Sequence, residues 1–364
     1  MCDILKHTTM KTGDKTMKKI HRTLSLFTVA AMCAALLCSC GAVSDSSQTD
    51  SSSKAATTTT ADTTADTTTA GEESSTASAT SAPDSSVSDS SSAVTDDTKT
   101  NGITPAMWKV TSPEGSTMVM LGSFHALKDE CYPLPEAVTN AYNNADILAV
   151  ECDITSTSED GEYMKNLMKQ MLYNDNTKLS QHISEEAYSA LQTYLGYWGM
   201  DISALEVYRP WAVSSTLDTL LIQDSDFDTE KGLDNFLLTT AHADGKEIYE
   251  VESVDFQMNL LINFSDDIYD LMFRSYKGET KESQKQALED LYTAWKSGDI
   301  ETFLEEDNEE ELAGYTEEDK KIAEDYNNQM LYDRNKNMAK AAEDLMSQGK
   351  NVFYVVGAAH YAGE

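Results

Sequence analysis

The sequence predicts an α/β domain with an α+β tendency, in which helices flank a central, mixed and partly parallel sheet. Short apolar runs that end at Leu121, Val150 and Val356 are typical of buried strands. Longer amphipathic segments with capping signals separate these runs, as they do in proteins whose strands alternate with helices. Residues 101–364 are also numerous enough to bury one large core. We therefore place one domain there, behind two N-terminal segments of different composition.

Turn and cap signals predict the elements of the first half of this domain. The Pro- and Gly-containing turn at 112–116 joins two strands in a hairpin. Pro135 suits the first position of a helix, and Ser184 suits the cap of another whose apolar residues share one face. The expected order is strands at 108–110 and 117–121, a helix at 135–144, a strand at 147–150, a helix from Ser184 to just before Gly199, a helix at 234–243 and a strand at 247–251.

The second half of the domain is predicted to be helical until its last strand. Ser283-Gln-Lys-Gln286 has the form of a capping box, which opens a helix, and Thr316-Glu-Glu-Asp319 is expected to open a longer one. A glycine closes the first of these helices. The expected order is a helix from Ser283 to near Gly298, a longer helix from Thr316 to Gln348 with a break at Asn327-Asn328, and a strand at 351–356.

Residues 1–40 predict a bacterial signal peptide. Lys18, Lys19 and Arg22 form a basic region before the apolar stretch 24–37, which is too short to span a bilayer comfortably. The sequence around Cys40 resembles a lipobox, so we expect Cys40 to be lipidated and the protein to be anchored on the extracellular face of the membrane. An ordinary signal peptide or a short anchor is the alternative. Met17 is the better start, so residues 1–16 are expected not to be translated.

Residues 41–100 are rich in Ser, Thr, Ala and Asp and contain no aromatic residue. Such a segment cannot bury enough apolar surface to offset the entropy that ordering would cost. We expect a disordered linker between the lipid anchor and the domain.

Charge and cysteine content exclude several classes of function. The chain has 62 acidic and 27 basic residues, a net charge of -35. This charge disfavours nucleic acid and anionic lipid headgroups as partners, so membrane contact is expected through the lipid anchor alone. Only Cys131 and Cys152 lie in the domain. They could pair with each other, but they provide neither a disulfide framework nor a cysteine-based zinc site.

Two of the six histidines follow an apolar strand and a glycine. They end the sequences Gly122-Ser-Phe-His125 and Gly357-Ala-Ala-His360. Glu151 and Glu252 follow two other predicted strands. Because sites in open α/β sheets form outside the carboxyl ends of the strands, we expect these two imidazoles and one or two carboxylates to meet in one pocket.

This residue set predicts a divalent metal site. Histidine nitrogen and carboxylate oxygen together accommodate zinc, manganese or cobalt. A metal with an open position acidifies water and polarises a carbonyl, which makes hydrolysis the natural chemistry. One carboxylate could instead stay free as a general base.

Each of these residues also has a structural interpretation. A lone histidine at a strand end is more often a hydrogen-bonded structural residue, and a glutamate after a strand is usually a helix cap or a solvated loop residue. Asp153 lies two residues after Glu151 and shares its face while the chain stays extended, so it is a plausible neighbour of the site. His182 and His242 are expected on the surface.

Many short motifs recur in order along 105–364. They are Trp108-Lys-Val110, Leu121-Gly-Ser-Phe-His125, Tyr132-Pro-Leu-Pro135, Ala145–Glu151, Arg209-Pro-Trp211, Gly232-Leu-Asp234, Glu252 with Gln257, Arg334-Asn335 and Val356-Gly-Ala-Ala-His360. In this order they resemble the TraB/PrgY/GumN family. That family is similar to the Tiki proteins, membrane-tethered metal-dependent proteases with paired Gly-x-x-His motifs, and belongs with erythromycin-esterase-like and ChaN-like domains.

The resemblance implies a hydrolase-like α/β fold and roles for particular residues. It carries His125, Glu151 and His360 onto the family's metal or catalytic positions. It implies that Arg334 stabilises an oxyanion or pairs with a site carboxylate, and it places Glu252 at a recurrent acidic position.

Two further expectations come from the resemblance. The segment Arg209-Pro-Trp211 would line the pocket, or be structural. Family members continue past the second histidine, whereas this sequence stops at Glu364. Either the sequence is a fragment or the last elements are missing, and the sheet edge beside His360 is then expected to be exposed.

Three functions are compatible with this sequence. The first is a surface-anchored, metal-dependent peptidase or related hydrolase acting on a peptide or small-molecule substrate. The second is a non-catalytic lipoprotein that binds or sequesters a peptide, such as a pheromone. The third is a structural surface lipoprotein with a decayed site. Metal binding separates the third from the others, and turnover separates the first from the second.

Overall fold

The computed structural model describes residues 102–156, 161–304 and 314–362. The predictions for the signal peptide, for lipidation of Cys40 and for the linker lie outside these residues. Within the described ranges, the structure contains no helix with the length and apolar character needed to cross a membrane.

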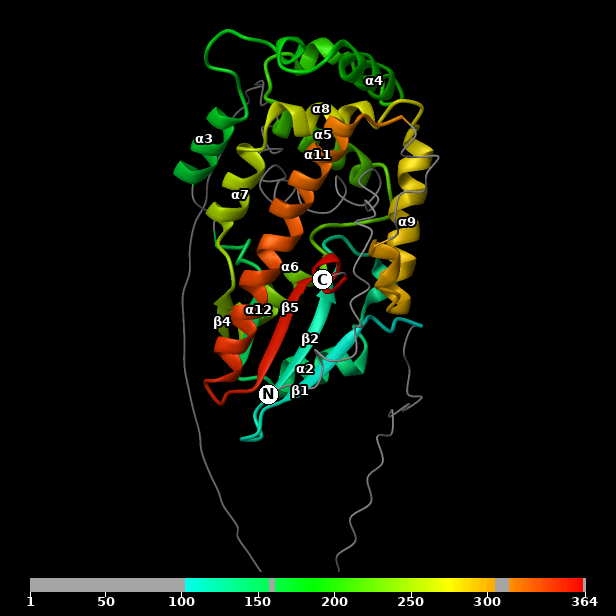
Figure 1. Cartoon of the computed structure of the whole chain (residues 1–364). Coiled ribbons are helices and arrows are strands. Elements are labelled where there is room, and N and C mark those ends of the chain that lie inside the picture. Colours follow the sequence, from blue (N-terminus) through cyan, green and yellow to red (C-terminus); the bar gives the residue numbers. More distant parts are fainter. Residues whose placement is uncertain (1–101, 157–160, 305–313, 363–364) are drawn as a thin grey trace, which may run out of the picture. The chain divides into compact units, whose positions relative to one another are not determined.

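A single five-stranded sheet forms the centre of the domain (Figure 1), with the strand order β1-β2-β5-β3-β4. The antiparallel hairpin of β1 and β2 is followed by parallel pairing of β2 with β5, β5 with β3 and β3 with β4. This arrangement confirms the predicted mixed, partly parallel sheet. The strands are β1 (Met107–Thr111), β2 (Thr117–Ser123), β3 (Ile147–Val150), β4 (Glu247–Glu250) and β5 (Val352–Gly357).

The expectation of an exposed sheet edge beside His360 is wrong, because the strand before this histidine lies in the middle of the sheet. β5 pairs with β2 on one side and β3 on the other, and all six of its residues are buried. The edge strands of the described sheet are β1 and β4. A strand that is apolar on both faces is stable only when both faces are covered, which is the usual situation inside a parallel sheet.

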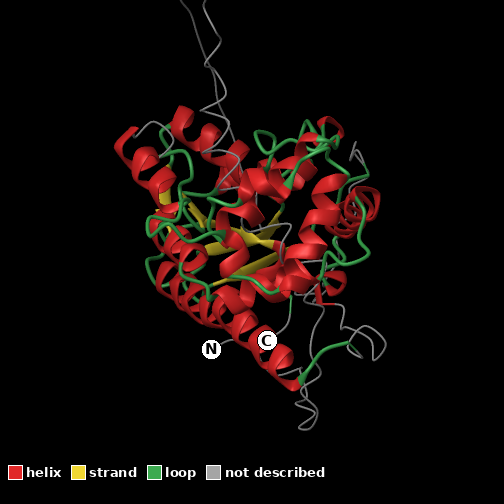
Figure 2. Ribbon diagram, turned by 90° about the horizontal axis from the view of Figure 1, so that it is seen from above, coloured by secondary structure: helices red, strands yellow, loops and turns green. Residues whose placement is uncertain are grey.

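Helices cover both faces of the sheet (Figure 2). Alternate residues of β5 pack against different helices. Phe353 and Val355 face the cluster formed with α2, α6 and α9. Tyr354 and Val356 face the opposite cluster, which includes residues of α12. This alternation is the period of two that a strand imposes on its side chains. The helices are α2 (Glu136–Asn144), α6 (Leu233–Asp244), α9 (Lys281–Ser297) and α12 (Asp333–Met346).

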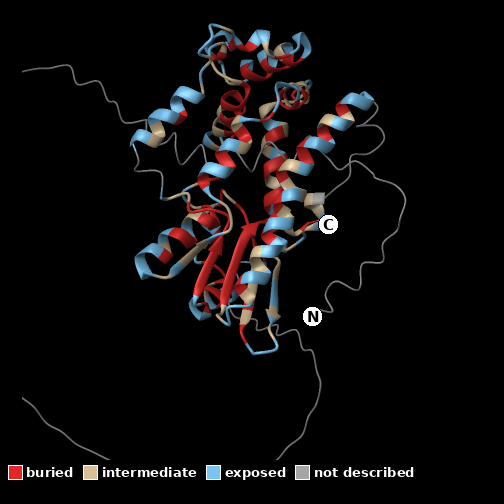
Figure 3. Cartoon of the chain, turned by 60° about the vertical axis from the view of Figure 1, so that its left-hand side comes forward, coloured by how far each residue is buried: buried red, intermediate tan, exposed pale blue. Residues whose placement is uncertain are grey.

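A second group of helices lies beyond the carboxyl ends of the parallel strands, in the upper part of Figure 1. These helices share their own apolar core, which includes Leu191, Trp211 and Phe273. Their buried residues form inward-facing stripes, and exposed residues cover their outer faces (Figure 3). The group comprises α3 (Gly161–Gln170), α4 (Glu185–Gly196), α5 (Pro210–Gln223), α7 (Val254–Ile262), α8 (Asp266–Arg274) and α11 (Glu317–Asn327).

Most cap predictions are confirmed, with two corrections. Ser184 accepts a hydrogen bond from the backbone of Ala187 as the cap of α4. The capping box of α9 is formed by Thr280 and Ser283, so the prediction that Ser283 opens this helix is wrong by three residues. Pro135 is the residue before α2 rather than its first residue.

The predicted break in the long helix is a π-helix at Asn328–Tyr332, which joins α11 to α12. Short 3₁₀ helices occur at Asp129–Cys131, Leu179–Gln181, Ile202–Leu205, Glu301–Leu304 and Ala358–Tyr361. Cys131 and Cys152 are both buried and free, so the possible disulfide between them does not form.

Asp319 connects α11 to α8 and supports a prediction about acid stability. Its carboxylate pairs with Arg274 and accepts hydrogen bonds from the backbone and hydroxyl of Thr316. The bond from Arg274 and then those from Thr316 lower the pKa of Asp319 to about 2. Because the folded-state pKa lies below the unfolded one, this stabilisation is present above about pH 4 and is lost as the pH falls toward the folded-state pKa.

We therefore expect Asp319→Asn to lower the free energy of unfolding at pH 7 by about 1–3 kcal/mol. The difference from wild type should shrink between about pH 4 and pH 2, as measured by urea unfolding at each pH. Asp333→Asn is the control, because Asp333 forms an exposed pair with Lys336 and should change stability by less than about 0.5 kcal/mol. A difference between Asp319→Asn and wild type that is independent of pH would contradict this role for the carboxylate.

Candidate functional site

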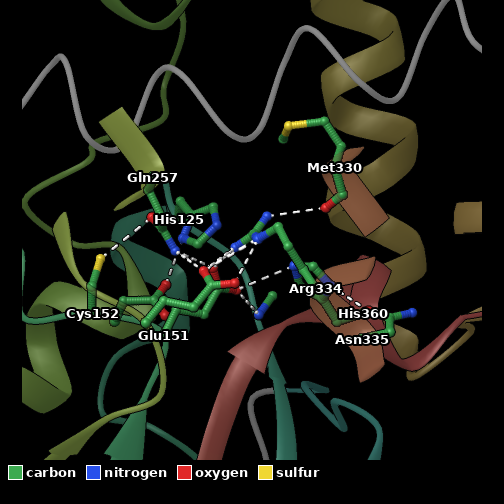
Figure 4. Close-up of polar contacts among 11 residues, drawn as sticks. His125, Glu151, Cys152, Gln257, Met330, Arg334, Asn335 and His360 are labelled. Carbon is green, nitrogen blue, oxygen red and sulfur yellow. Dashed lines mark hydrogen bonds and ion pairs between the residues drawn. The ribbon is translucent and has the colours of Figure 1, made fainter. Parts of the chain in front are cut away.

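His125, Glu151 and His360 lie close together beyond the carboxyl ends of the parallel strands (Figure 4). Glu252 is connected to Glu151 through Arg334 and Gln257. His125 follows β2, Glu151 follows β3, Glu252 follows β4 and His360 follows β5. Parallel pairing in register brings these strand ends together, since Val150 lies opposite Val355 and Glu250 in its two neighbours.

Glu151 is the centre of the polar network. Its Oε1 accepts a hydrogen bond from the backbone N–H of Gly357 (2.6 Å) and lies 3.7 Å from Nε2 of His360. Its Oε2 accepts hydrogen bonds from Arg334 (2.7 Å) and Gln257 (2.9 Å). Burial alone raises the pKa of this carboxyl, but Arg334 and then the two histidines outweigh burial and hold the pKa far below its ordinary value. Glu151 is therefore an ionised carboxylate in a buried position.

Both histidines have one ring nitrogen fixed by a neighbour. Nδ1 of His125 lies 2.7 Å from the Asp234 carboxylate, and Nδ1 of His360 lies 2.6 Å from the side-chain oxygen of Asn335. Because both partner atoms are assigned as oxygen acceptors, Nδ1 is the donor in each ring. The Nε2 atoms are then left with a lone pair in the neutral rings.

The two histidines differ in their electrostatics. For His125, burial lowers the pKa, but the charge and hydrogen bond of Asp234 outweigh burial, so the pKa is raised. For His360, burial is only partly offset by Glu151, and the pKa falls to about 4. The site therefore contains one imidazole that is neutral at neutral pH and one that binds a proton more readily.

Arg334 joins two of the strand ends through its guanidinium group. It donates to Glu151 at 2.7 Å and to Glu252 at 2.8–3.2 Å, and its Nη1 donates to the backbone oxygen of Met330. These bonds use four of the five N–H groups of the side chain. Met330 belongs to the π-helix, an irregularity that is frequent at functional sites because it changes the direction of the residues that follow.

Gln257 connects the same two carboxylates from another helix. Its amide nitrogen donates to Glu151 and to Glu252, while its oxygen accepts from the Cys152 thiol. The two carboxylates are thus held by one cation and one amide, with the Gly357 N–H as a further donor to Glu151.

Gly357 leaves a space between the two histidines and Glu151. A Cβ atom on Gly357 would lie 3.1 Å from Glu151 Oε1, 3.6 Å from the His360 ring and 3.7 Å from Nε2 of His125. The approach is closer still at Gly122, where a Cβ atom would lie 2.9 Å from the backbone of Ala358. Neither glycine has a positive φ, so the close contacts, and not the backbone conformation, explain why glycine occurs at both positions.

Three residues that hold the site together had no predicted role, namely Asp234, Asn335 and Gln257. Each of them belongs to one of the short motifs on which the family resemblance rests. The clearest pointer is Gly232, where a Cβ atom would lie 2.1 Å from the backbone oxygen of His125. Only glycine permits this approach, which brings the start of α6, and with it Asp234, close to His125.

Some other expectations are not met. Asp153 turns away from Glu151, because β3 ends at Val150 and the chain is no longer extended there. It pairs instead with His242, whose side chain is half exposed as predicted.

His182 is not a free surface residue, since it bonds to Asp266 and Thr177 and stacks on Tyr173. Trp211 is buried in the helical core, which favours the structural interpretation of that residue.

The donor set suits a divalent metal, although the described side chains are not drawn together around one point. Across residues 102–156, 161–304 and 314–362, no three His, Cys, Asp or Glu groups are close enough to hold an ion. Bonds of about 2.0–2.1 Å in a tetrahedral site place ligand atoms roughly 3.3 Å apart, and Glu151 Oε1 lies 3.7 Å from His360 Nε2. A movement of a few tenths of an ångström would close this gap. Metal-ligating histidines also usually donate their other ring nitrogen to a neighbour, as both imidazoles do here through Nδ1.

Comparison with known proteins gives the family of the chain. The family model described as the TraB/PrgY/gumN family matches residues 106–364. Two curated relatives, each called "Uncharacterized protein YbaP", come from Escherichia coli (strain K12) and Shigella flexneri. Each is 28% identical over 157 residues, which cover 43% of this chain and 56% of the relative. The match therefore spans little more than half the length of these relatives.

No solved structure matches the chain. The family model nevertheless covers almost the whole described domain, including all four strand-end residues and Arg334. The protein therefore belongs to the TraB/PrgY/gumN family.

Proposed function

We propose that this protein is a metal-dependent hydrolase, peptidase-like in its chemistry, held on the outer surface of a bacterial cell by a lipid on Cys40. The observation that carries the proposal is the pair His125 and His360, whose Nδ1 atoms are held by neighbours beside one ionised carboxylate, Glu151. Release of a Cys40→Ser variant from the membrane fraction would test the anchor.

His125 and His360 would hold the metal through Nε2, and Glu151 would hold it through Oε1. A divalent ion bound there supplies acidification of a water molecule and polarisation of a substrate carbonyl. Asp234 and Asn335 fix the two rings so that both Nε2 atoms are available. Arg334 and Gln257 bind Oε2 of Glu151 and so leave Oε1 facing the histidines.

Glu252 and Arg334 act in this proposal as positioning residues. Glu252 neutralises the buried guanidinium, and Arg334 keeps Glu151 ionised and correctly oriented. With four of its N–H groups in use, Arg334 has only one Nη1–H left to contact an oxyanion. Its pairing with the site carboxylates is therefore the better supported of the two roles that the sequence suggested.

Metal binding and cleavage test the proposal directly. The wild-type chain should bind close to one Mn, Co or Zn ion and cleave members of a peptide library, whereas His125→Ala and His360→Ala should lose both properties while staying folded. Metal content by mass spectrometry, cleavage by peptide profiling and folding by circular dichroism are the measurements.

His242→Ala is the matched control, because His242 is an exposed histidine outside the site. It should bind metal and cleave peptides as wild type does. Metal binding that depends on the two site histidines without any cleavage would favour the non-catalytic peptide-binding function. A wild-type chain that takes up no metal would refute the metallohydrolase.

Gly357→Ala should block the site without disturbing the fold. Its backbone φ is negative, so alanine is permitted there, but the added methyl group would fill the space among Glu151, His360 and His125. We expect metal affinity and cleavage to fall by at least tenfold, on the order of the 10–100-fold losses seen when metal-site surroundings are altered. Thermal unfolding should change little.

Gly196→Ala is the control for this substitution, since a Cβ atom there meets nothing within 4 Å and the residue lies in a helix. It should keep full metal binding. If Gly357→Ala binds metal and cleaves peptides as well as Gly196→Ala, the space beside Gly357 is not the reaction site.

Arg334→Met should strongly destabilise the domain, because it leaves Glu151 and Glu252 buried without their cation. Breaking a buried ion pair from one side costs about 3–5 kcal/mol, measurable by urea unfolding. Adding Glu252→Gln to this variant should recover part of the loss, since one uncompensated charge is removed. Lys340→Met, which breaks an exposed pair with Asp344, should cost less than about 1 kcal/mol. Equal stability of the Arg334 and Lys340 variants would argue against the buried network.

A further inference from the structure

A cavity lies within the second group of helices, and the residues that line it are different from those of the strand-end site. It has a volume of about 230 Å³. Its apolar wall contains Trp211, Phe264 and Tyr269, and its polar groups are contributed by the loop after α3, the start of α5 and the start of α8. These polar residues are Tyr173, Asp175, His182, Arg209 and Asp266.

Two of the residues that line this cavity carry a buried hydrogen-bond donor without a partner. Nε of Arg209 and the hydroxyl of Tyr173 are buried and make no hydrogen bond. The guanidinium of Arg209 also forms no ion pair with any described residue, although the chain is strongly acidic. A buried donor without a partner costs free energy, and buried polar groups in native proteins nearly always have one. The two donors therefore point to a ligand that accepts hydrogen bonds.

The carboxylates in the cavity already have donors. Asp266 bonds to Nδ1 of His182 at 2.8 Å, and Asp175 accepts the hydroxyl of Thr177 at 2.6 Å. Nε2 of His182 lies 2.8 Å from the hydroxyl oxygen of Thr177. The acids and His182 thus satisfy one another, and Arg209 is the charge left without a counter-ion.

The start of α5 adds to the preference for an anion. Arg209 is the residue before this helix and makes no side-chain cap. The helix N-terminus carries partial positive charge and unsatisfied backbone N–H groups, which favour a negatively charged ligand nearby.

We propose that this cavity binds the carboxylate of a small apolar organic acid. Arg209 would contact the carboxylate with its planar N–H groups and Tyr173 would donate a further hydrogen bond. The aromatic wall would enclose the apolar part of the ligand. The volume suits a single residue-sized group rather than a large molecule. A free carboxylic acid and the C-terminal residue of a peptide present the same chemistry.

Calorimetric titration of the full chain tests this site independently of catalysis and metal. The probes are N-acetyl-L-leucine, N-acetyl-L-leucinamide, and a tripeptide ending in leucine with either a free or an amidated C-terminus. We expect each free acid that fits to bind at least about tenfold more tightly than its amide, as the loss of a charge-assisted hydrogen bond implies. Binding of N-acetyl-L-leucine alone would assign the site to small acids. Binding of the free tripeptide as well would include peptide C-termini.

Two variants locate the binding. Tyr173→Phe keeps the ring that stacks on His182 and removes only the unpartnered hydroxyl, so it should weaken acid binding without lowering thermal stability. Arg209→Gln should abolish the preference for acid over amide. Lys169→Gln, a change of the same charge at an exposed lysine of α3, should bind as wild type does. Equal affinity for acid and amide, no binding of any probe, or wild-type binding by both cavity variants would overturn the proposal.

Discussion

One buried guanidinium group sets the geometry of the candidate site. Arg334 binds Glu151 at the end of β3 and Glu252 after β4, and the next residue, Asn335, holds His360. The first turn of α12 therefore fixes three of the four strand-end groups. A buried cation is tolerated only when it is paired and hydrogen-bonded, so the chain has to bring both carboxylates to it. The fold and the site depend on the same contacts.

The buried strands could be predicted because each is a short apolar run, and the bounds of β3 agree with the expected 147–150. Local sequence did not decide between overlapping capping boxes. Thr280 and Ser283 both carry suitable hydroxyls, and in the structure Thr280 is the cap, with Ser283 as its partner in the capping box, so α9 starts three residues earlier than predicted. The place of β5 within the sheet could not be predicted from local sequence, because the strands it pairs with lie about two hundred residues or more away.

In the candidate site too, some residues could be predicted from local sequence and others could not. His125, Glu151 and His360 could be predicted because each follows a strand, and parallel strands end at a common edge. Asp234, Asn335 and Gln257 lie on helices, and the sequence does not specify where a helix packs relative to the sheet. Asp153 was misplaced for a local reason, since the two-residue period holds only while the chain is extended and β3 ends at Val150. Arg209 was interpreted within the segment Arg209-Pro-Trp211 and His182 as a surface residue, whereas in the structure the two line one cavity.

The central place of β5 also has a consequence for how the protein is made. β2 and β3 do not pair with each other, so the sheet consists of two separate halves until the strand near the end of the chain is inserted between them. The nascent protein would therefore leave the ribosome with apolar strand edges uncovered, a situation that favours aggregation and recognition by chaperones. The same step that closes the sheet delivers His360 to Glu151. Synthesis of the full strand and assembly of the site are thus a single event, and a chain interrupted before this strand would lack both.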